Sequence, residues 1–277
     1  MSRYKFNDGT EVLRLGLGTW AMGDSAAHRR EEIRALQTGI DLGMSVIDTA
    51  EMYGDGRSEL LVGEAIAGRR DEVFLISKVL PSNATYHGIL QACERSLQRL
   101  HTDYLDLYLL HWQGRYPFEE TVRAMQQLVQ QSKIKRWGVS NMDVRQMEDF
   151  FAIPAGDSCA ANEILYNLSR RGVEYDLLPW CAAHHMPVIA YSPIEQGRIL
   201  HDRTLDTVAQ KHGATPAQIA LAWVLRDPNI IAIPKSAHPD RVASNFKSLS
   251  IQLDNTDLAM LDRAFPPPSH KMPLEMI

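Results

Sequence analysis

The stretch Leu105-Asp106-Leu107-Tyr108-Leu109-Leu110-His111 decides the fold. It is a short apolar run that ends at an ionisable side chain, without the regular polar alternation of a half-exposed strand. Runs of this kind are typical of strands that are buried on both faces of a parallel sheet. The sequence therefore predicts a buried parallel strand whose carboxyl end presents His111.

Similar runs recur along the chain, with helical segments between them. The other apolar runs are 45–47, 73–76, 189–190 and 230–233. Apolar residues at helical spacing share one face within 33–40, 89–100 and 122–129, and Thr215-Pro216 opens a further helix with proline in its first turn. The alternation predicts an α/β fold, and about eight such units fit the length, which favours a closed (β/α)8 TIM barrel over an open sheet.

Local signals mark a hairpin, a helix start and a tail. An Asp8-Gly9 turn lies between short segments from Lys5 to Val12, which predicts an N-terminal β-hairpin. Ser58 precedes an apolar run and is expected to cap a helix. The run 266–268 is three prolines near the C-terminus and is interpreted as a tail. No linker or low-complexity tract divides the chain, so we expect one domain over residues 1–277.

Composition excludes several classes of protein. The chain has 29 Lys and Arg against 34 Asp and Glu, a formal net charge of −5, which argues against a dedicated nucleic-acid binder. No apolar run approaches the ~20 residues of a membrane span, and residues 1–11 lack the apolar core of a signal peptide. The three cysteines are few and far apart, which indicates reduced thiols. We expect a cytoplasmic monomer that binds neither nucleic acid nor membrane.

The predicted strands share one feature, which is that each ends at polar or ionisable side chains. In chain order these are Asp48, Lys78, His111, Ser140-Asn141, Asn162-Glu163, Tyr191-Ser192 and Lys235-Ser236. Barrels of this type build their active sites at the carboxyl ends of the strands. The alternative is that strands simply lead into polar loops. That alternative accounts for a serine or an asparagine, but poorly for an aspartate, a lysine and a histidine on three consecutive strands.

These side chains suggest acid–base chemistry on a carbonyl group. Tyr53 follows Asp48 by five residues and can fold back over Asp48, Lys78 and His111. A nearby ammonium lowers the pKa of a phenol, a carboxylate holds that ammonium in place, and an imidazole adds a second hydrogen-bonding group. Such a set fits protonation of a carbonyl oxygen as it gains negative charge. Reduction also needs a hydride, which only a cofactor supplies.

The last predicted strand ends in a group that suits a phosphate. Lys235 and Ser236 end this strand, and Arg241 and Asn245 follow on an expected helix. Two cations and a hydroxyl at a helix N-terminus suit a phosphate monoester, which indicates the 2′-phosphate of NADPH. The alternative, a solvated lysine and arginine at a helix start, is common and stays open at this point.

The chain resembles the aldo-keto reductase superfamily over nearly its whole length. The similar segments are 16–20 (GLGTW), 47–54 (IDTAEMYG), 63–65 (GEA), 77–78 (SK), 104–112 (YLDLYLLHW), 138–141 (GVSN), Asn162, 190–193 (AYSP) and 233–236 (IPKS) with Arg241 and Asn245. The resemblance implies a (β/α)8 barrel that binds NADPH in an extended form without a Rossmann motif. The chain resembles in particular bacterial members of the methylglyoxal reductase type, which reduce small reactive aldehydes.

The resemblance also implies roles for individual residues. Tyr53 would donate the proton, Lys78 would lower its pKa, Asp48 would anchor Lys78, and His111 would orient the carbonyl group. The cofactor would be held by Ser140, Asn141 and Glu163 at the carboxamide, Tyr191 on the nicotinamide, Ser192 and Ile194 at the pyrophosphate, and Lys235, Ser236, Arg241 and Asn245 at the 2′-phosphate end. Trp20 and Trp112 would wall the substrate pocket, and no metal is implied.

Two positions depart from the family pattern. Relatives usually carry glutamine where this chain has Glu163, and an ionised glutamate can only accept hydrogen bonds. Its charge would favour the cationic oxidised ring, so we expect Glu163→Gln to tighten NADPH binding relative to NADP+. Ser244 stands where relatives often have an adenine-binding glutamate, and no role is assigned to it.

Two other motifs are rejected. Residues 16–21 fit the dinucleotide pattern G-x-G-x-x-A, but an aromatic residue sits in the turn and the next strand-end acid, Asp48, comes about ten residues late. Cys181, His184 and His185 are close in sequence, yet no second cluster completes a metal site, so they are expected to cap or flank a helix.

The sequence therefore predicts NADPH-dependent reduction of aldehydes, and some ketones, to alcohols. The resemblance implies small reactive aldehydes such as methylglyoxal as substrates. Short loops around the predicted site leave its mouth open, which weakens selectivity for one large ligand. The alternative is a regulatory NADPH-binding subunit with little turnover, since similar barrels serve as channel subunits. Turnover of a small aldehyde separates the two.

Overall fold

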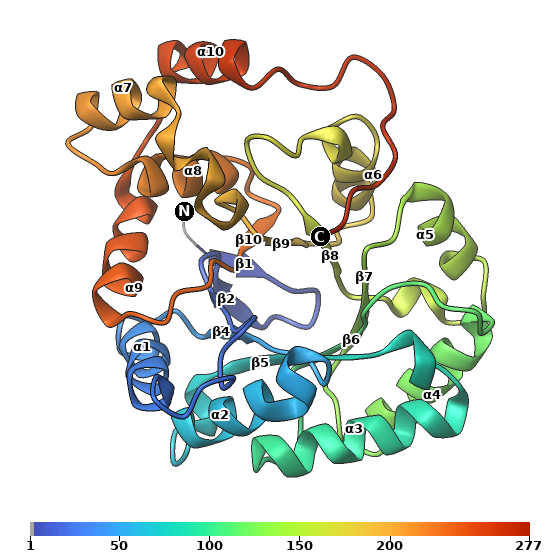
Figure 1. Cartoon of the computed structure of the whole chain (residues 1–277). Coiled ribbons are helices and arrows are strands. Elements are labelled where there is room, and N and C mark those ends of the chain that lie inside the picture. Colours follow the sequence, from blue (N-terminus) through green and yellow to red (C-terminus); the bar gives the residue numbers. More distant parts are fainter. Residues whose placement is uncertain (1–2) are drawn as a thin grey trace.

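Eight parallel strands form the centre of the protein in this computed structural model, which describes residues 3–277. Each strand pairs with the next one along the chain, so the sheet runs in order from β3 to β10 (Figure 1). The strands are β3 (Leu17–Gly18), β4 (Val46–Asp48), β5 (Phe74–Val79), β6 (Leu107–Leu110), β7 (Trp137–Ser140), β8 (Asn162–Leu165), β9 (Val188–Tyr191) and β10 (Ile230–Ala232). Nearly every residue in them is buried, as their unbroken apolar runs predict.

The sheet closes on itself where its first and last strands meet. Parallel bridges join Leu15 to Ala232 and Gly18 to Lys235 across this seam. A Cβ atom at Gly18 would lie 2.7 Å from the Ile233 carbonyl oxygen, so the close approach requires glycine. The closed ring of eight parallel strands confirms the predicted (β/α)8 TIM barrel.

Helices surround the strands, and at least one lies between each pair of consecutive strands (Figure 1). They are α1 (Arg29–Asp41), α2 (Arg57–Ala65), α3 (Tyr86–Leu100), α4 (Phe118–Gln130), α5 (Val144–Phe151), α6 (Leu177–Ala183), α7 (Arg203–Lys211), α8 (Pro216–Val224), α9 (Pro239–Phe246) and α10 (Asn255–Ala264). Their apolar faces pack on the outside of the sheet. No helix within residues 3–277 is long and apolar enough to cross a membrane.

One of the two predicted helix starts is confirmed and the other is wrong. At α8 the Thr215 side chain accepts from the Gln218 amide while the Gln218 side chain accepts from the Thr215 amide, a reciprocal cap. By contrast, α2 begins at Arg57, after Gly56 with φ +86°, so Ser58 lies inside the helix. Its hydroxyl instead donates to Thr19 Oγ1 at 2.8 Å, which satisfies the hydrogen-bonding requirement of a buried hydroxyl.

The predicted hairpin is confirmed and closes the amino end of the barrel. Strands β1 (Arg3–Lys5) and β2 (Glu11–Leu13) pair antiparallel around the Asp8-Gly9 turn, where Gly9 has φ +88°. Phe6 of the hairpin stacks on Phe74, and both belong to the apolar cluster inside the barrel. The hairpin therefore fills the barrel interior at the amino ends of the strands, and the carboxyl ends remain available for an active site.

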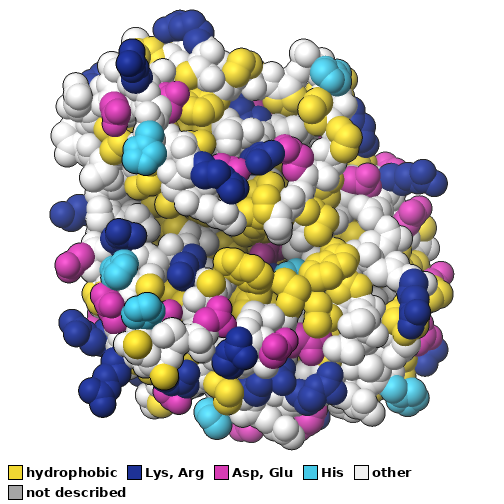
Figure 2. Space-filling view, in the orientation of Figure 1, with side chains coloured by type: hydrophobic (Ala, Val, Ile, Leu, Met, Phe, Trp, Pro, Cys, Tyr) yellow, Lys and Arg dark blue, Asp and Glu magenta, His cyan; other side chains and the backbone are white. Residues whose placement is uncertain are grey.

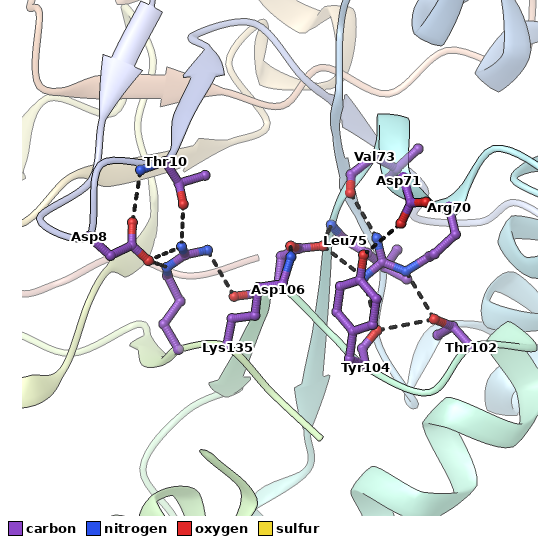
Figure 3. A network of polar contacts seen from close by, with 11 residues as sticks. Asp8, Thr10, Arg70, Asp71, Val73, Leu75, Thr102, Tyr104, Asp106 and Lys135 are labelled. Carbon is purple, nitrogen blue, oxygen red and sulfur yellow. Dashed lines mark hydrogen bonds and ion pairs between the residues drawn. The ribbon is translucent and has the colours of Figure 1, made fainter. Parts of the chain in front are cut away.

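A network of charged side chains fastens the hairpin to the strands (Figure 3). The buried Arg136 guanidinium pairs with Asp8 and donates to the Asp106 carbonyl oxygen at 3.2 Å. The Asp106 carboxylate in turn pairs with Arg70 at 2.7 Å and with Lys135 at 2.9 Å. This network lies at the amino face of the barrel, where such contacts stabilise the fold.

Candidate active site

Asp48, Lys78 and His111 lie together at the carboxyl ends of three adjacent strands, β4, β5 and β6. The strand register places them there, since β4 pairs with β5 and β5 with β6 in parallel. Lys78 Nζ lies 2.5 Å from Asp48 Oδ1, and it also donates to the Thr49 carbonyl oxygen at 3.1 Å. All three side chains are buried, with Lys78 fully inaccessible.

Tyr53 folds back over this group from the loop that follows β4. The segment Tyr53–Gly56 is a short 3-10 turn in which Gly54 has φ +57°, and a Cβ atom there would meet Asp24 Oδ1 at 2.5 Å. The turn brings the Tyr53 hydroxyl oxygen to 3.1 Å from Lys78 Nζ, which donates a hydrogen bond to it. The structure thus unites the four residues that the sequence singles out for proton transfer.

Burial controls the protonation of Tyr53 and His111. It raises the pKa of Tyr53 above the ordinary value, and the Lys78 charge opposes this only in part, so the phenol keeps its proton. The ammonium acts in the direction that the sequence predicts, but burial outweighs it. Burial also lowers the pKa of His111 to about 2, with a smaller contribution from the Lys78 charge, so the imidazole is neutral. Its buried Nδ1 has no hydrogen-bond partner within residues 3–277.

Glu163 lies on the same ammonium. Its Oε1 is 3.3 Å from Lys78 Nζ, and its side chain is buried, like that of Asp48. Burial alone would lower the pKa of Lys78, but the charges of Asp48 and Glu163 raise it above its ordinary value. Burial and the Asp48 charge hold the pKa of Glu163 well above its usual range, against the opposing Lys78 charge. Lys78 therefore stays charged between two acidic side chains.

The predicted carboxamide and nicotinamide residues adjoin this cluster. Ser140 Oγ donates to the Glu163 carbonyl oxygen at 2.9 Å. Asn141, which has φ +57°, donates to the His111 carbonyl oxygen at 3.1 Å and accepts from the Tyr191 hydroxyl at 2.9 Å. These bonds fix the side chains of Ser140, Asn141 and Tyr191 relative to His111 and to the β8 backbone, so the polar groups at one end of the barrel form a single connected set.

The segment after β9 holds a strained backbone beside this set. Ser192 and Glu195 both have positive φ, +47° and +49°, which non-glycine residues rarely adopt. The buried Glu195 carboxylate is held by Arg170 at 3.0 Å and by Arg198 at 2.8 Å, which keeps the segment in place. Ile194 lies between the two strained residues and packs partly on the core. Glu195 has no local signal in the sequence, because its partner Arg170 comes from another loop.

The residues predicted to bind a phosphate lie beside the seam where the barrel closes. Lys235 follows β10 and Arg241 lies on α9, and both side chains are exposed, while Asn245 is buried on the same helix. Within residues 3–277 neither cation pairs with a carboxylate, whereas the neighbouring His238 pairs with Glu31 at 2.7 Å. Ser236 Oγ accepts from the His238 amide at 3.2 Å. Two unpaired cations beside a helix start fit an anion, and here that would be a phosphate.

Aromatic side chains pack against the rings of Tyr53 and His111. The Trp20 ring, which is 53% exposed, meets the Tyr53 ring edge to face at 5.0 Å, and the Trp112 ring lies 4.8 Å from His111. Figure 2 shows a hollow in the middle of this face, rimmed mainly by hydrophobic side chains. The arrangement suits a small carbonyl compound whose carbon portion is apolar.

The C-terminal tail crosses the same face of the barrel, a contact that is not predicted from the sequence. Glu275 pairs with Arg170 at 2.5 Å and Lys271 with Asp176 at 2.9 Å, so the tail is tied to the segment between β8 and α6. The Ile277 backbone reaches the Tyr191 hydroxyl, and Figure 1 shows the chain ending beside β8 and β9. No local signal marks this contact, since the two partners lie far apart in sequence.

Cys181 and His184 lie in and at the end of α6, which agrees with the expectation that they cap or flank a helix. His184 stacks on Trp180 at 3.9 Å between ring centroids and ends the helix, while Cys181 is buried in it. In the part of the chain that the structure describes, no three His, Cys, Asp or Glu side chains are grouped to hold a metal.

Comparison with known proteins gives a consistent result. A family model described as "Aldo/keto reductase family" matches residues 14–265. The chain is 49% identical to methylglyoxal reductase YeaE of Escherichia coli K12 over 278 residues, covering 99% of this chain and 98% of that protein. It is 32% identical to glyoxal reductase of Bacillus subtilis, covering 93% and 91% of the two chains.

A solved structure agrees over the whole chain. An aldo/keto reductase from Klebsiella pneumoniae, crystallised in complex with NADP and acetate, is 49% identical and superposes with a TM-score of 0.97. The match covers 100% of this chain and 99% of that one. The resemblance seen in the sequence is thereby confirmed, and the chain belongs to the aldo/keto reductase family of oxidoreductases.

Proposed function

We propose that this protein uses NADPH to reduce small reactive aldehydes, methylglyoxal among them, to alcohols. One observation carries the proposal: a protonated tyrosine, Tyr53, is held 3.1 Å from the buried ammonium of Lys78 at the open end of the barrel. A proton donor beside a fixed positive charge suits an oxygen that becomes negative during reaction. Membership of a reductase family supports the same reading.

The residues around this tyrosine fit the cofactor. Ser140, Asn141 and Glu163 would hold the carboxamide and Tyr191 would stack on the ring, while Lys235 and Arg241 would bind the 2′-phosphate as unpaired cations. Ser192 and Ile194 would line the pyrophosphate, and Ser236 and Asn245 would complete the adenosine end. When bound, NADPH supplies the hydride. The Klebsiella pneumoniae relative, which was crystallised with NADP, supports this assignment.

The side chains of this protein supply the proton. The neutral His111 would orient the carbonyl oxygen, and Tyr53 would donate its hydroxyl proton to that oxygen as the oxygen gains charge. The phenolate left behind would be stabilised by the Lys78 ammonium, which Asp48 fixes at 2.5 Å. Solvent would then return a proton to Tyr53. Because Tyr53 stays protonated over the physiological pH range, it can donate a proton in every catalytic cycle.

The rim of the site favours a small substrate. Trp20 contacts the Tyr53 ring and Trp112 the His111 ring, and the tail crosses the same face of the barrel. The relatives named as methylglyoxal and glyoxal reductases support a short dicarbonyl substrate.

Kinetics with a substrate panel test the proposal. NADPH oxidation is followed with methylglyoxal, an aromatic aldehyde and a sugar, and methylglyoxal should give the highest kcat/KM of the three. Higher kcat/KM for the sugar contradicts the substrate assignment. Tight NADPH binding without turnover of any aldehyde supports the regulatory subunit instead.

A further inference from the structure

Two buried carboxyl groups share one ammonium at the centre of the site. Lys78 Nζ lies 2.5 Å from Asp48 Oδ1 and 3.3 Å from Glu163 Oε1, and all three side chains are at most 3% exposed. The hydrogen bond to Asp48 is short and charge-assisted, whereas the contact to Glu163 is longer.

The charges in this cluster do not balance if every acid is ionised. The other titratable groups around Glu163 are Tyr53 on the loop after β4, His111 after β6 and Tyr191 on β9. The two tyrosines keep their protons and the imidazole is neutral, so none of them offsets a second carboxylate. An uncompensated charge in a buried site is expensive, and two carboxyl groups that share a site normally retain one proton between them.

The contacts indicate which carboxyl group keeps that proton. Asp48 accepts the strong hydrogen bond from Lys78, so its negative charge is well compensated. Glu163 Oε2 is buried and has no hydrogen-bond partner within residues 3–277. A carboxylate oxygen in that setting lacks the donors that would stabilise its charge, whereas a protonated carboxyl group is a donor and an acceptor, as glutamine is.

We propose that Glu163 holds a proton at neutral pH and acts as a pH-sensitive positioning residue, which sets the preference of the site for the reduced or the oxidised cofactor. The proposal rests on the proposed function, because it concerns the nicotinamide end of that cofactor site. Protonated Glu163 leaves the Lys78 ammonium to Asp48 and Tyr53. Ionised Glu163 adds a negative charge beside both Tyr53 and the ring site.

The sign of the effect follows from this charge. NADP+ carries a cationic ring and NADPH a neutral one, so the oxidised form favours ionised Glu163 and the reduced form favours protonated Glu163. Low pH therefore favours NADPH and reduction, and high pH favours NADP+ and oxidation. This changes the expectation from the sequence, since the charge of Glu163 acts on cofactor preference only in the alkaline part of the range.

Cofactor titrations across pH test this coupling. The dissociation constants of NADPH and NADP+ are measured between about pH 6 and about pH 9, and the ratio Kd(NADPH)/Kd(NADP+) should rise by about tenfold, the effect of a one-unit pKa difference between the two complexes. In Glu163→Gln the ratio should be independent of pH. The control Glu32→Gln changes a buried glutamate on α1 that accepts from the Gly23 amide, and it should keep the wild-type slope.

Calorimetry gives a second readout on the wild-type protein. In buffers of different ionisation enthalpy, NADP+ binding should release more protons than NADPH binding at neutral pH. The 2′-phosphate is common to both cofactors, so its own titration cancels in the difference. Equal proton release, or a pH-dependent affinity ratio that persists in Glu163→Gln, overturns the proposal.

Infrared spectroscopy of the cofactor-free protein separates this proposal from the proposed function. At neutral pH the wild type should show the carbonyl stretch of a protonated carboxyl group, and Glu163→Gln should lack it while Glu32→Gln retains it. If the band is present but NADPH does not bind, the proposed function fails and the protonation of Glu163 stands. If the wild type shows no such band, Glu163 is ionised and the inference is wrong.

Discussion

The Tyr53 hydroxyl oxygen accepts a hydrogen bond from the Lys78 ammonium at 3.1 Å, although the two residues belong to different strand–loop units. The Gly54 backbone turn places the phenol, and Asp48 places the ammonium. The phenol thus has a fixed partner that stabilises its conjugate base, which is the property that a proton donor to a carbonyl oxygen needs.

Removing the hydroxyl should stop the chemistry and leave binding intact. We expect Tyr53→Phe to lower kcat for aldehyde reduction by about 10²–10⁴-fold or more, the usual contribution of a general acid. NADPH affinity, followed by fluorescence titration, should stay within a few-fold of the wild type because the ring and its Trp20 contact remain. Turnover at the wild-type rate would assign the proton donor elsewhere.

Lys78 should be needed for folding as well as for activity. Lys78→Met leaves two buried acidic groups without their cation, so we expect a loss of about 3–5 kcal/mol in the free energy of unfolding, measured with denaturant. The double variant Lys78→Met/Asp48→Asn removes one of those acids and should regain part of this stability without regaining activity. Equal stability of the single and double variants would show that Asp48 does not depend on Lys78.

The phosphate assignment predicts a change in cofactor preference. Lys235→Ala should weaken NADPH binding by about tenfold or more, the scale of one charge-assisted contact, and leave NADH binding unchanged. Lys247→Ala is the matched control, because Lys247 is an exposed lysine just beyond α9. A parallel loss for NADH and NADPH, or the same loss in the control, would place the 2′-phosphate elsewhere.

His111 should not titrate in the working range. Its pKa of about 2 lies below the ordinary histidine value of about 6.5, so kcat for reduction should not fall on the acid side near pH 6.5. The same depression makes His111 reduce the stability of the fold as pH falls through the unfolded value, since the unfolded chain takes up the proton first. An acid limb near pH 6.5 that disappears in His111→Gln contradicts the neutral imidazole.

The cap of α8 should contribute to stability alone. Thr215→Ala removes one side of a reciprocal cap and should lower the free energy of unfolding by about 1 kcal/mol, with kcat/KM unchanged. Thr207→Ala serves as the control, since Thr207 is an exposed threonine within α7. Similar losses in both variants would mean that the cap contributes nothing specific.

The sequence predicts what depends on strand register and misses what depends on contacts between loops. The positions of Asp48, Lys78 and His111 follow from parallel strands that pair in chain order. The cap at Thr215 is equally local. Ser58 does not cap a helix as its local sequence predicts, because its hydroxyl bonds to the buried Thr49 and Thr19 from other segments.

The remaining misses concern ionic contacts over long sequence separations. Glu195 meets Arg170 across 25 residues, and Glu275 meets Arg170 across 105 residues. Neither pairing leaves a periodic or local pattern. The sequence also does not predict that Tyr53 keeps its proton. The pKa of the phenol depends mainly on how deeply it is buried, and the sequence shows only that a cation lies nearby.

The seam between Gly18 and Lys235 joins the beginning of the barrel to its end, and the lysine proposed to hold the cofactor phosphate is one of its two members. The first strand of the ring has only two residues, and backbone hydrogen bonds from Gly16 to Ala232 and from Gly18 to Pro234 help to close the ring there. A cofactor bound at Lys235 would stabilise this junction between the first and last strands. Occupancy of the site would then govern how readily the barrel opens, so the supply of NADPH in the surroundings would also set the lifetime of the folded protein.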